Sequence, residues 1–174
     1  GNIIDSMSTY GHKAIGVPGT VAGLVAAHEK YGSLDWATLV EPAVQFAREG
    51  YRITEAEANR LNRFKPAFQQ FNKHPNAFVK EADWQTGDLL VQPDLAATME
   101  RIRDNKMDGF YTGETADFIV AEMQRHGGLI TLEDLKNYQA EWRSPITENY
   151  KNYRIISMPP ASSGGIAVAQ LMSI

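Results

Sequence analysis

The amino-acid sequence predicts an α+β fold that is mostly helical and carries a β-hairpin near its C-terminal end. Capping residues stand before amphipathic segments through residues 20–138, which is typical of consecutive helices. Two extended segments then flank Lys151 and Asn152, the pattern of a hairpin turn. A short apolar run at residues 14–17 adds one early strand to this prediction.

The composition narrows the classes of function. With 174 residues and 43% hydrophobic content, the chain is long enough to form one domain with a core. Its net charge of −4 argues against nucleic-acid binding, which needs a basic surface. Because cysteine is absent, disulfides, thiol catalysis and thiolate metal sites are excluded within these residues. No apolar run approaches the roughly 20 residues that span a bilayer.

The first two helices are predicted from the residues that flank them. Thr20 stands where an N-cap residue is needed, and we expect Gly32 to end this helix in the left-handed conformation. Pro42 suits the first position of the next helix, because the N–H that proline lacks has no partner there. This second helix is predicted to end at Gly50.

The middle of the chain combines a strong helix start with an irregular stretch. Residues 54–57 form a capping box, and Pro66 is expected to start a separate segment. Residues 74–88 show no periodicity and are predicted to be irregular. Residues 89–91 are predicted to be extended, and a helix follows over residues 93–103.

The last third of the chain predicts a helix, a second capping box and the hairpin. Apolar residues recur on one face of Gly113–His126, and Gly127 can cap this helix. Residues 131–134 repeat the capping-box pattern. Ile146–Tyr150 and residues 153–158 are the two strands of the predicted hairpin.

Residues 157–165 read Ser-Met-Pro-Pro-Ala-Ser-Ser-Gly-Gly and join the hairpin to an apolar segment, residues 166–174. Consecutive prolines end the strand, and the glycines permit a close backbone approach. Ser162 or Ser163 can cap the helix that follows. That helix lacks a terminating glycine and a polar tail, so we expect residues 1–174 to be a single fragment of a longer protein, incomplete at both ends.

Two segments invite a catalytic or binding interpretation. Ser162 and Ser163 do not complete the Gly-x-Ser-x-Gly spacing of a nucleophile elbow, and no general base accompanies them, so helix capping is favoured over catalysis. Residues 16–24 read Gly-Val-Pro-Gly-Thr-Val-Ala-Gly-Leu, which is neither a Rossmann fingerprint nor a P-loop. An anion at this helix N-terminus is one interpretation, and tight packing of Gly23 is favoured over it.

The histidines do not predict a metal site. All four are scattered through the sequence: His12, His28, His74 and His126. We recognise no second ligand at helical metal spacing beside them, and His28-Glu29 lacks the second histidine of an HExxH motif. The sequence therefore predicts surface histidines and no bound metal.

Several segments, taken in order, resemble the large subunit of the γ-glutamyltranspeptidases, also called glutathione hydrolases. Residues 16–24 are similar to the family's Gly-Val-Pro-Gly-Thr-Val-Ala-Gly-Leu segment, and residues 110–113 to its Phe-Tyr-x-Gly turn. Residues 127–138 are similar to its Gly-Gly-Leu-Ile-Thr run with the Asp-Leu and Tyr that follow. Residues 158–165 resemble its Met-Pro-Pro-Pro-Ser-Ser-Gly-Gly loop, with Ala161 in place of one proline. The resemblance extends over nearly the whole chain.

This resemblance implies an N-terminal-nucleophile hydrolase with an αββα sandwich, made as a precursor that cleaves itself into two subunits. The new N-terminal threonine of the small subunit attacks the γ-glutamyl carbonyl of glutathione or a related donor, and its α-amine is the base. Water, an amino acid or a peptide then accepts the γ-glutamyl group. The implied partners are the small subunit and γ-glutamyl substrates, with no cofactor. Bacterial members are typically periplasmic or secreted.

None of the family's catalytic residues maps onto this chain. The nucleophilic threonine and the serine pair at the oxyanion site belong to the small subunit, and the arginine that clamps the glutamyl carboxylate precedes these residues. We therefore predict no catalytic residue and no metal ligand here, leave substrate-binding residues unknown, and expect the fragment alone to be inactive. Residues 18–20 and 159–165 are the loops to test for substrate contact.

Two alternatives stay open at this point. An acylase or a poly-γ-glutamate depolymerase on the same scaffold would share these segments, because the residues that separate such enzymes lie outside the chain. A non-enzymatic helical interaction module is the alternative from another class. Such a module should terminate its last helix, whereas residues 166–174 present an open apolar edge.

Overall fold

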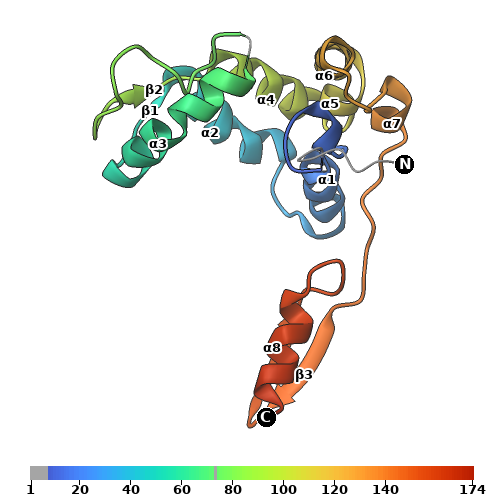
Figure 1. Ribbon diagram of the computed structural model, residues 1–174. Coiled ribbons are helices and arrows are strands. Elements are labelled where there is room, and N and C mark those ends of the chain that lie inside the picture. The colour runs from blue at the N-terminus through green and yellow to red at the C-terminus, as the bar shows by residue number, and fades with distance from the viewer. Residues whose placement is uncertain (1–7, 73) are drawn as a thin grey trace, which may run out of the picture. The chain divides into compact units, whose positions relative to one another are not determined.

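The computed structural model describes residues 8–72 and 74–174 (Figure 1). The chain divides into two compact units, Gly1–Gln139 and Ala140–Ile174. The described part of the first unit is helical apart from one short pair of strands, and the second unit consists of a hairpin and one helix. The prediction of a mostly helical α+β chain with a late hairpin is confirmed.

The first unit is a succession of helices joined by short connections. Its elements are η1 (His12–Ala14), α1 (Thr20–Tyr31), α2 (Trp36–Glu49), β1 (Tyr51–Arg52), α3 (Glu55–Phe71), β2 (Leu89–Leu90), α4 (Pro93–Asn105), α5 (Asp108–Tyr111), α6 (Gly113–His126) and α7 (Leu132–Lys136). The strands β1 and β2 pair antiparallel, with Tyr51 opposite Leu90. This pairing joins the end of α2 to the start of α4.

Three predicted helix boundaries are confirmed by their hydrogen bonds. Thr54 Oγ1 accepts from the Glu57 N–H at 3.3 Å, and Glu57 Oε2 accepts from the Thr54 N–H at 2.7 Å, which completes the capping box of α3. Thr131 and Asp134 make the same reciprocal bonds at α7. These bonds lower the pKa of the Glu57 and Asp134 carboxyl groups, so both are ionised at neutral pH. Gly127 ends α6 with a φ of 71°, in the left-handed region.

The region around the first helix differs from the prediction. The early strand at residues 14–17 is wrong, because His12–Ala14 is a 3-10 turn and the chain then reaches α1 without regular structure. The N-cap of α1 is Gly19, and Thr20 is already helical. Gly32 has a φ of −67° and is not left-handed. A Cβ at this position would overlap the preceding turn of α1, so space rather than φ favours glycine.

Pro42 and Pro66 lie inside α2 and α3 rather than at helix starts, which corrects both predictions. The α2 helix begins earlier, after Asp35, whose Oδ2 accepts from the Thr38 N–H at 3.1 Å. A proline removes one helical hydrogen bond and disturbs the turn before it. The α2 helix stays continuous through Pro42 because its apolar face, including the fully buried Val44, packs on α4.

The core of the first unit lies between helices that are neighbours in space. The α2 helix packs on α4, α4 on α5, and α5 on α6, and these contacts can be followed in Figure 1. The buried apolar residues of these helices are Val44, Ala47, Ala96, Ile102, Tyr111, Ala116, Val120 and Met123. At the rim, Arg103 of α4 pairs with Glu41 of α2 at 2.6 Å. This stack of helices fixes where the motif residues on α5 and α6 lie.

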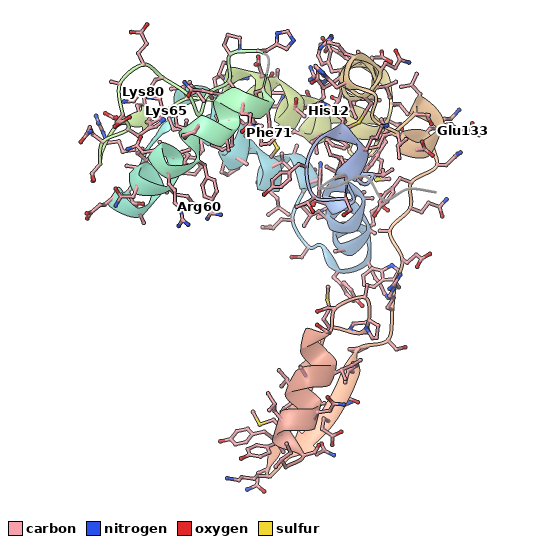
Figure 2. All side chains as sticks on the ribbon, in the orientation of Figure 1. His12, Arg60, Lys65, Phe71, Lys80 and Glu133 are labelled. Carbon is pink, nitrogen blue, oxygen red and sulfur yellow. The ribbon has the colours of Figure 1, made fainter. Side chains whose placement is uncertain are left out.

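The irregular stretch at residues 74–88 is confirmed, and side chains hold it in place. It covers a second apolar cluster, formed by Ile53, Ala58, Trp84 and Leu90. The Lys80 ammonium lies 4.5 Å from the centre of the Trp84 ring, a cation–π contact. Lys65 reaches the same stretch from α3 and donates to the Glu81 carbonyl at 2.8 Å (Figure 2).

The second unit contains the predicted hairpin and the last helix. Strands β3 (Ile146–Tyr150) and β4 (Tyr153–Ser157) are antiparallel, with Tyr150 opposite Tyr153, which confirms the hairpin. The α8 helix (Gly164–Met172) packs on both strands and begins slightly earlier than predicted. None of the helices in the described residues has both the length and the apolar character needed to cross a bilayer.

Candidate functional site

The turn at residues 16–20 is held by one buried hydroxyl group. The Tyr111 side chain, at the end of α5, donates to the Pro18 carbonyl at 2.6 Å and accepts from the Ala22 N–H at 3.2 Å. Tyr111 is only 3% exposed, and this burial raises the pKa of its hydroxyl. The bond from Ala22 satisfies one of the free N–H groups at the start of α1. An anion bound at this helix N-terminus would otherwise use that group.

Gly19 is the glycine of this turn that packs tightly. A Cβ at Gly19 would overlap the Tyr138 hydroxyl and ring, and the Tyr138 ring stacks on Tyr111 with 5.6 Å between centroids. The expected tight packing of Gly23 against a neighbouring element is wrong, since apart from the adjoining backbone of α1 the described residues place no atom within 4 Å of its added Cβ. Three segments that are far apart in the sequence therefore meet through Gly19, Tyr111 and Tyr138.

Replacing Tyr111 with phenylalanine should lower the free energy of unfolding by about 2 kcal/mol, because the Pro18 carbonyl and the Ala22 N–H lose their buried partner. Urea unfolding of the whole protein measures this change. Tyr138→Phe is the matched control, because the described residues offer the Tyr138 hydroxyl no hydrogen bond. Equal losses in the two variants would show that the hydrogen bonds of Tyr111 contribute little.

The second candidate loop, residues 158–165, belongs to the second unit. The Arg143 guanidinium donates to the Pro160 carbonyl at 2.9 Å and pairs with Glu141 at 3.2 Å. A hollow of 440 Å³ lies among these residues and the adjoining loop. A Cβ at Gly165 would overlap the Met158 carbonyl, so the predicted close approach of a glycine backbone is present. Contact of either loop with substrate stays a prediction.

Ser162 and Ser163 behave as helix-end residues. The N-cap of α8 is Ser163, whose side chain makes no capping bond, and Ser162 Oγ accepts from the Gly164 N–H at 3.3 Å. Within the described part of the chain, no hydrogen bond joins either hydroxyl to a histidine. The Ser162 hydroxyl therefore satisfies a free N–H at the start of α8, as the sequence favoured, whereas the Ser163 side chain forms no cap.

The fold brings together three side chains that the sequence did not connect. His12 Nε2 lies 3.0 Å from Glu122 Oε1, and His126 Nε2 lies 3.3 Å from the same oxygen. Glu122 and His126 are one helical turn apart on α6, a spacing that our sequence reasoning overlooked. His12 comes from η1, before α1, and only the tertiary fold places it here. This group is the one described cluster that could hold a metal ion.

Comparison with known proteins gives matches along nearly the whole chain. A family model described as gamma-glutamyltranspeptidase matches residues 2–174. The glutathione hydrolase proenzyme of Pseudomonas aeruginosa is 41% identical over 174 residues, which cover 100% of this chain and 31% of that protein. A crystal structure of gamma-glutamyltranspeptidase from Helicobacter pylori matches with a TM-score of 0.92 and 40% identity, over 98% of this chain and 50% of that one.

A more distant structure shares the same architecture. The cephalosporin acylase from Bacillus halodurans matches with a TM-score of 0.81 and 30% identity, over 89% of this chain and 30% of that one. The chain thus spans less than a third of the Pseudomonas aeruginosa protein that it resembles. Since the family model covers nearly every residue and relatives at about 40% identity match over the whole chain, this chain belongs to the γ-glutamyltranspeptidase family.

Proposed function

We propose that the whole protein cleaves γ-glutamyl amide bonds in glutathione and related donors. In this proposal a precursor cleaves itself, and the threonine at the new N-terminus becomes the nucleophile. Water, an amino acid or a peptide accepts the γ-glutamyl group. The partners of this chain are then the small subunit of the same precursor and a γ-glutamyl substrate. A periplasmic or secreted location in a bacterium is part of the same proposal.

The observation that carries the proposal is the match along the entire chain with a glutathione hydrolase proenzyme at 41% identity. The internal geometry supports it, because the Gly19 turn, Tyr111 and Tyr138 pack together as parts of one structure. In this proposal the described residues support the catalytic subunit and do not perform the chemistry. The isolated 174-residue chain should therefore have no activity.

The test is to express the whole protein and follow two events separately. Gel electrophoresis and N-terminal sequencing report self-cleavage and identify the new N-terminal residue. Release of p-nitroaniline from γ-glutamyl-p-nitroanilide, with and without an acceptor dipeptide, reports hydrolysis and transfer. We expect cleavage before a threonine, turnover of this donor, and loss of both when that threonine is replaced by alanine.

Other outcomes separate the proposal from its rivals. Self-cleavage without turnover of the γ-glutamyl donor would favour an acylase, in line with the similarity to the Bacillus halodurans enzyme. A whole protein that neither cleaves itself nor acts on the donor would contradict the proposal. In that case a role as a helical interaction module would explain the chain better.

A further inference from the structure

A group of two imidazoles and one carboxylate lies outside the motif segments at residues 16–24, 110–113 and 158–165. The ligand atoms of His12, Glu122 and His126 all lie within 4.8 Å of one another. Both histidines direct Nε2 toward Glu122 Oε1, and their rings stack with 4.6 Å between centroids. The group joins two elements, because His12, labelled in Figure 2, lies on η1 and the other two residues lie near the end of α6.

We propose that these three side chains bind one Zn²⁺ ion, which ties the η1 turn to the C-terminal end of α6. Two imidazoles and one carboxylate form a donor set that zinc takes in proteins, with water as the fourth ligand. Imidazole nitrogen also suits copper and nickel, whereas calcium and magnesium prefer oxygen.

The distances within the group fit such an ion. Zinc binds nitrogen and oxygen at roughly 2.0–2.2 Å, so neighbouring ligand atoms of a tetrahedral site lie about 3.3 Å apart. The two histidine–glutamate distances are 3.0 and 3.3 Å. Two of the three ligand pairs thus already have the spacing of a tetrahedral site, and all three ligand atoms lie within 4.8 Å of one another.

The carboxylate is oriented and charged for this role. Arg125 Nη1 donates to Glu122 Oε2 at 2.6 Å, which leaves Oε1 facing the two histidines. The hydrogen bond from His12, together with the neighbouring Arg125 guanidinium, holds the pKa of Glu122 below its ordinary value. Glu122 is thus an anion at neutral pH.

The position of His12 is determined by close packing, and the site is open to solvent. Gly128 follows α6, and a Cβ there would lie only 3.1 Å from His12 Cβ, so the turn passes directly over the helix end. His12 and His126 also line an open cavity of 590 Å³. The side chains of His12, Glu122 and His126 are 20%, 40% and 25% exposed. An ion and its water ligand can therefore enter.

Hydrogen bonds alone are the competing explanation, because 3.0 and 3.3 Å are also hydrogen-bond distances. The test strips the whole protein of metal with a chelator and titrates it with Zn²⁺ by calorimetry. Four variants are compared with the unmodified protein: His12→Ala, Glu122→Gln, His126→Ala and the control His74→Ala. His74 is exposed and lies outside the group.

We expect one Zn²⁺ per chain to bind at this group, at least about tenfold more weakly in each of the three ligand variants and unchanged in the control. Hydrogen exchange should also slow at residues 8–14 when Zn²⁺ is added, and this protection should vanish in His126→Ala. Absence of Zn²⁺ binding, or equal affinity in His126→Ala and the unmodified protein, would overturn the proposal.

Two further measurements guard against an unfolded variant. Circular dichroism without metal should be the same for all variants and the unmodified protein. X-ray absorption of the unmodified protein loaded with Zn²⁺ should show two imidazole ligands, and a spectrum without imidazole would refute the site even if every variant misfolds. Neither readout depends on γ-glutamyl turnover, so the outcome is independent of the proposed function.

Discussion

Replacing Gly109 with alanine should lower the free energy of unfolding by about 3 kcal/mol. Gly109 lies in α5 at its contact with α4, where an added Cβ would overlap the Arg101 carbonyl. The overlapping atoms belong to the backbone of α4, so no rotamer change relieves the clash and α5 must move. That movement would also draw the Tyr111 hydroxyl away from Pro18. Urea unfolding of the whole protein measures the loss, and hydrogen exchange at residues 16–22 reports the loosened turn.

Gly23→Ala is the matched control for Gly109, because both glycines are helical. The described chain leaves open space around Gly23, and alanine has the higher helix propensity. We therefore expect Gly23→Ala to be neutral or to stabilise the protein by up to about 1 kcal/mol. Equal losses at the two positions would contradict the steric explanation for Gly109.

Leu135→Ala should cost about 3 kcal/mol, the usual penalty for truncating a buried leucine. Leu135 lies in the short helix α7 and is 0% exposed, and α7 packs on α5 and α6. The change loses the favourable free energy of burying the leucine side chain. It also leaves a cavity that rigid neighbouring helices cannot fill completely. Because Tyr138 follows in the next turn of chain, its stacking on Tyr111 should weaken as well. Thermal and urea unfolding of the whole protein test this prediction.

Leu132 provides the comparison in the same helix. Its side chain is 48% exposed, so Leu132→Ala should change stability by no more than about 0.5 kcal/mol. A loss at Leu132 as large as that at Leu135 would mean that another part of the whole protein covers this face of α7. A small loss at Leu135 would contradict its role in the core.

Local chemistry explains which structural predictions succeeded. The capping boxes at Thr54 and Thr131 and the left-handed Gly127 rest on contacts within four residues, so they follow from the sequence directly. Pro42 and Pro66 were misplaced because both prolines lie inside continuous helices; in α2 the packing of Val44 and Ala47 outweighs the local preference of the proline. Gly19 rather than Gly23 is tightly packed because Tyr138, far along the chain, lies beside it.

The sequence by itself determined the fold class, most helix boundaries, the hairpin and the γ-glutamyltranspeptidase family, because these depend on local hydrogen bonding and on ordered motifs. Only the tertiary structure decided that the Tyr111 hydroxyl braces the Pro18 turn and that His12 meets Glu122 and His126. These contacts join residues separated by 93 and 110 positions. Such pairs form only when several helices pack at once, and no local pattern specifies which partners that packing brings together.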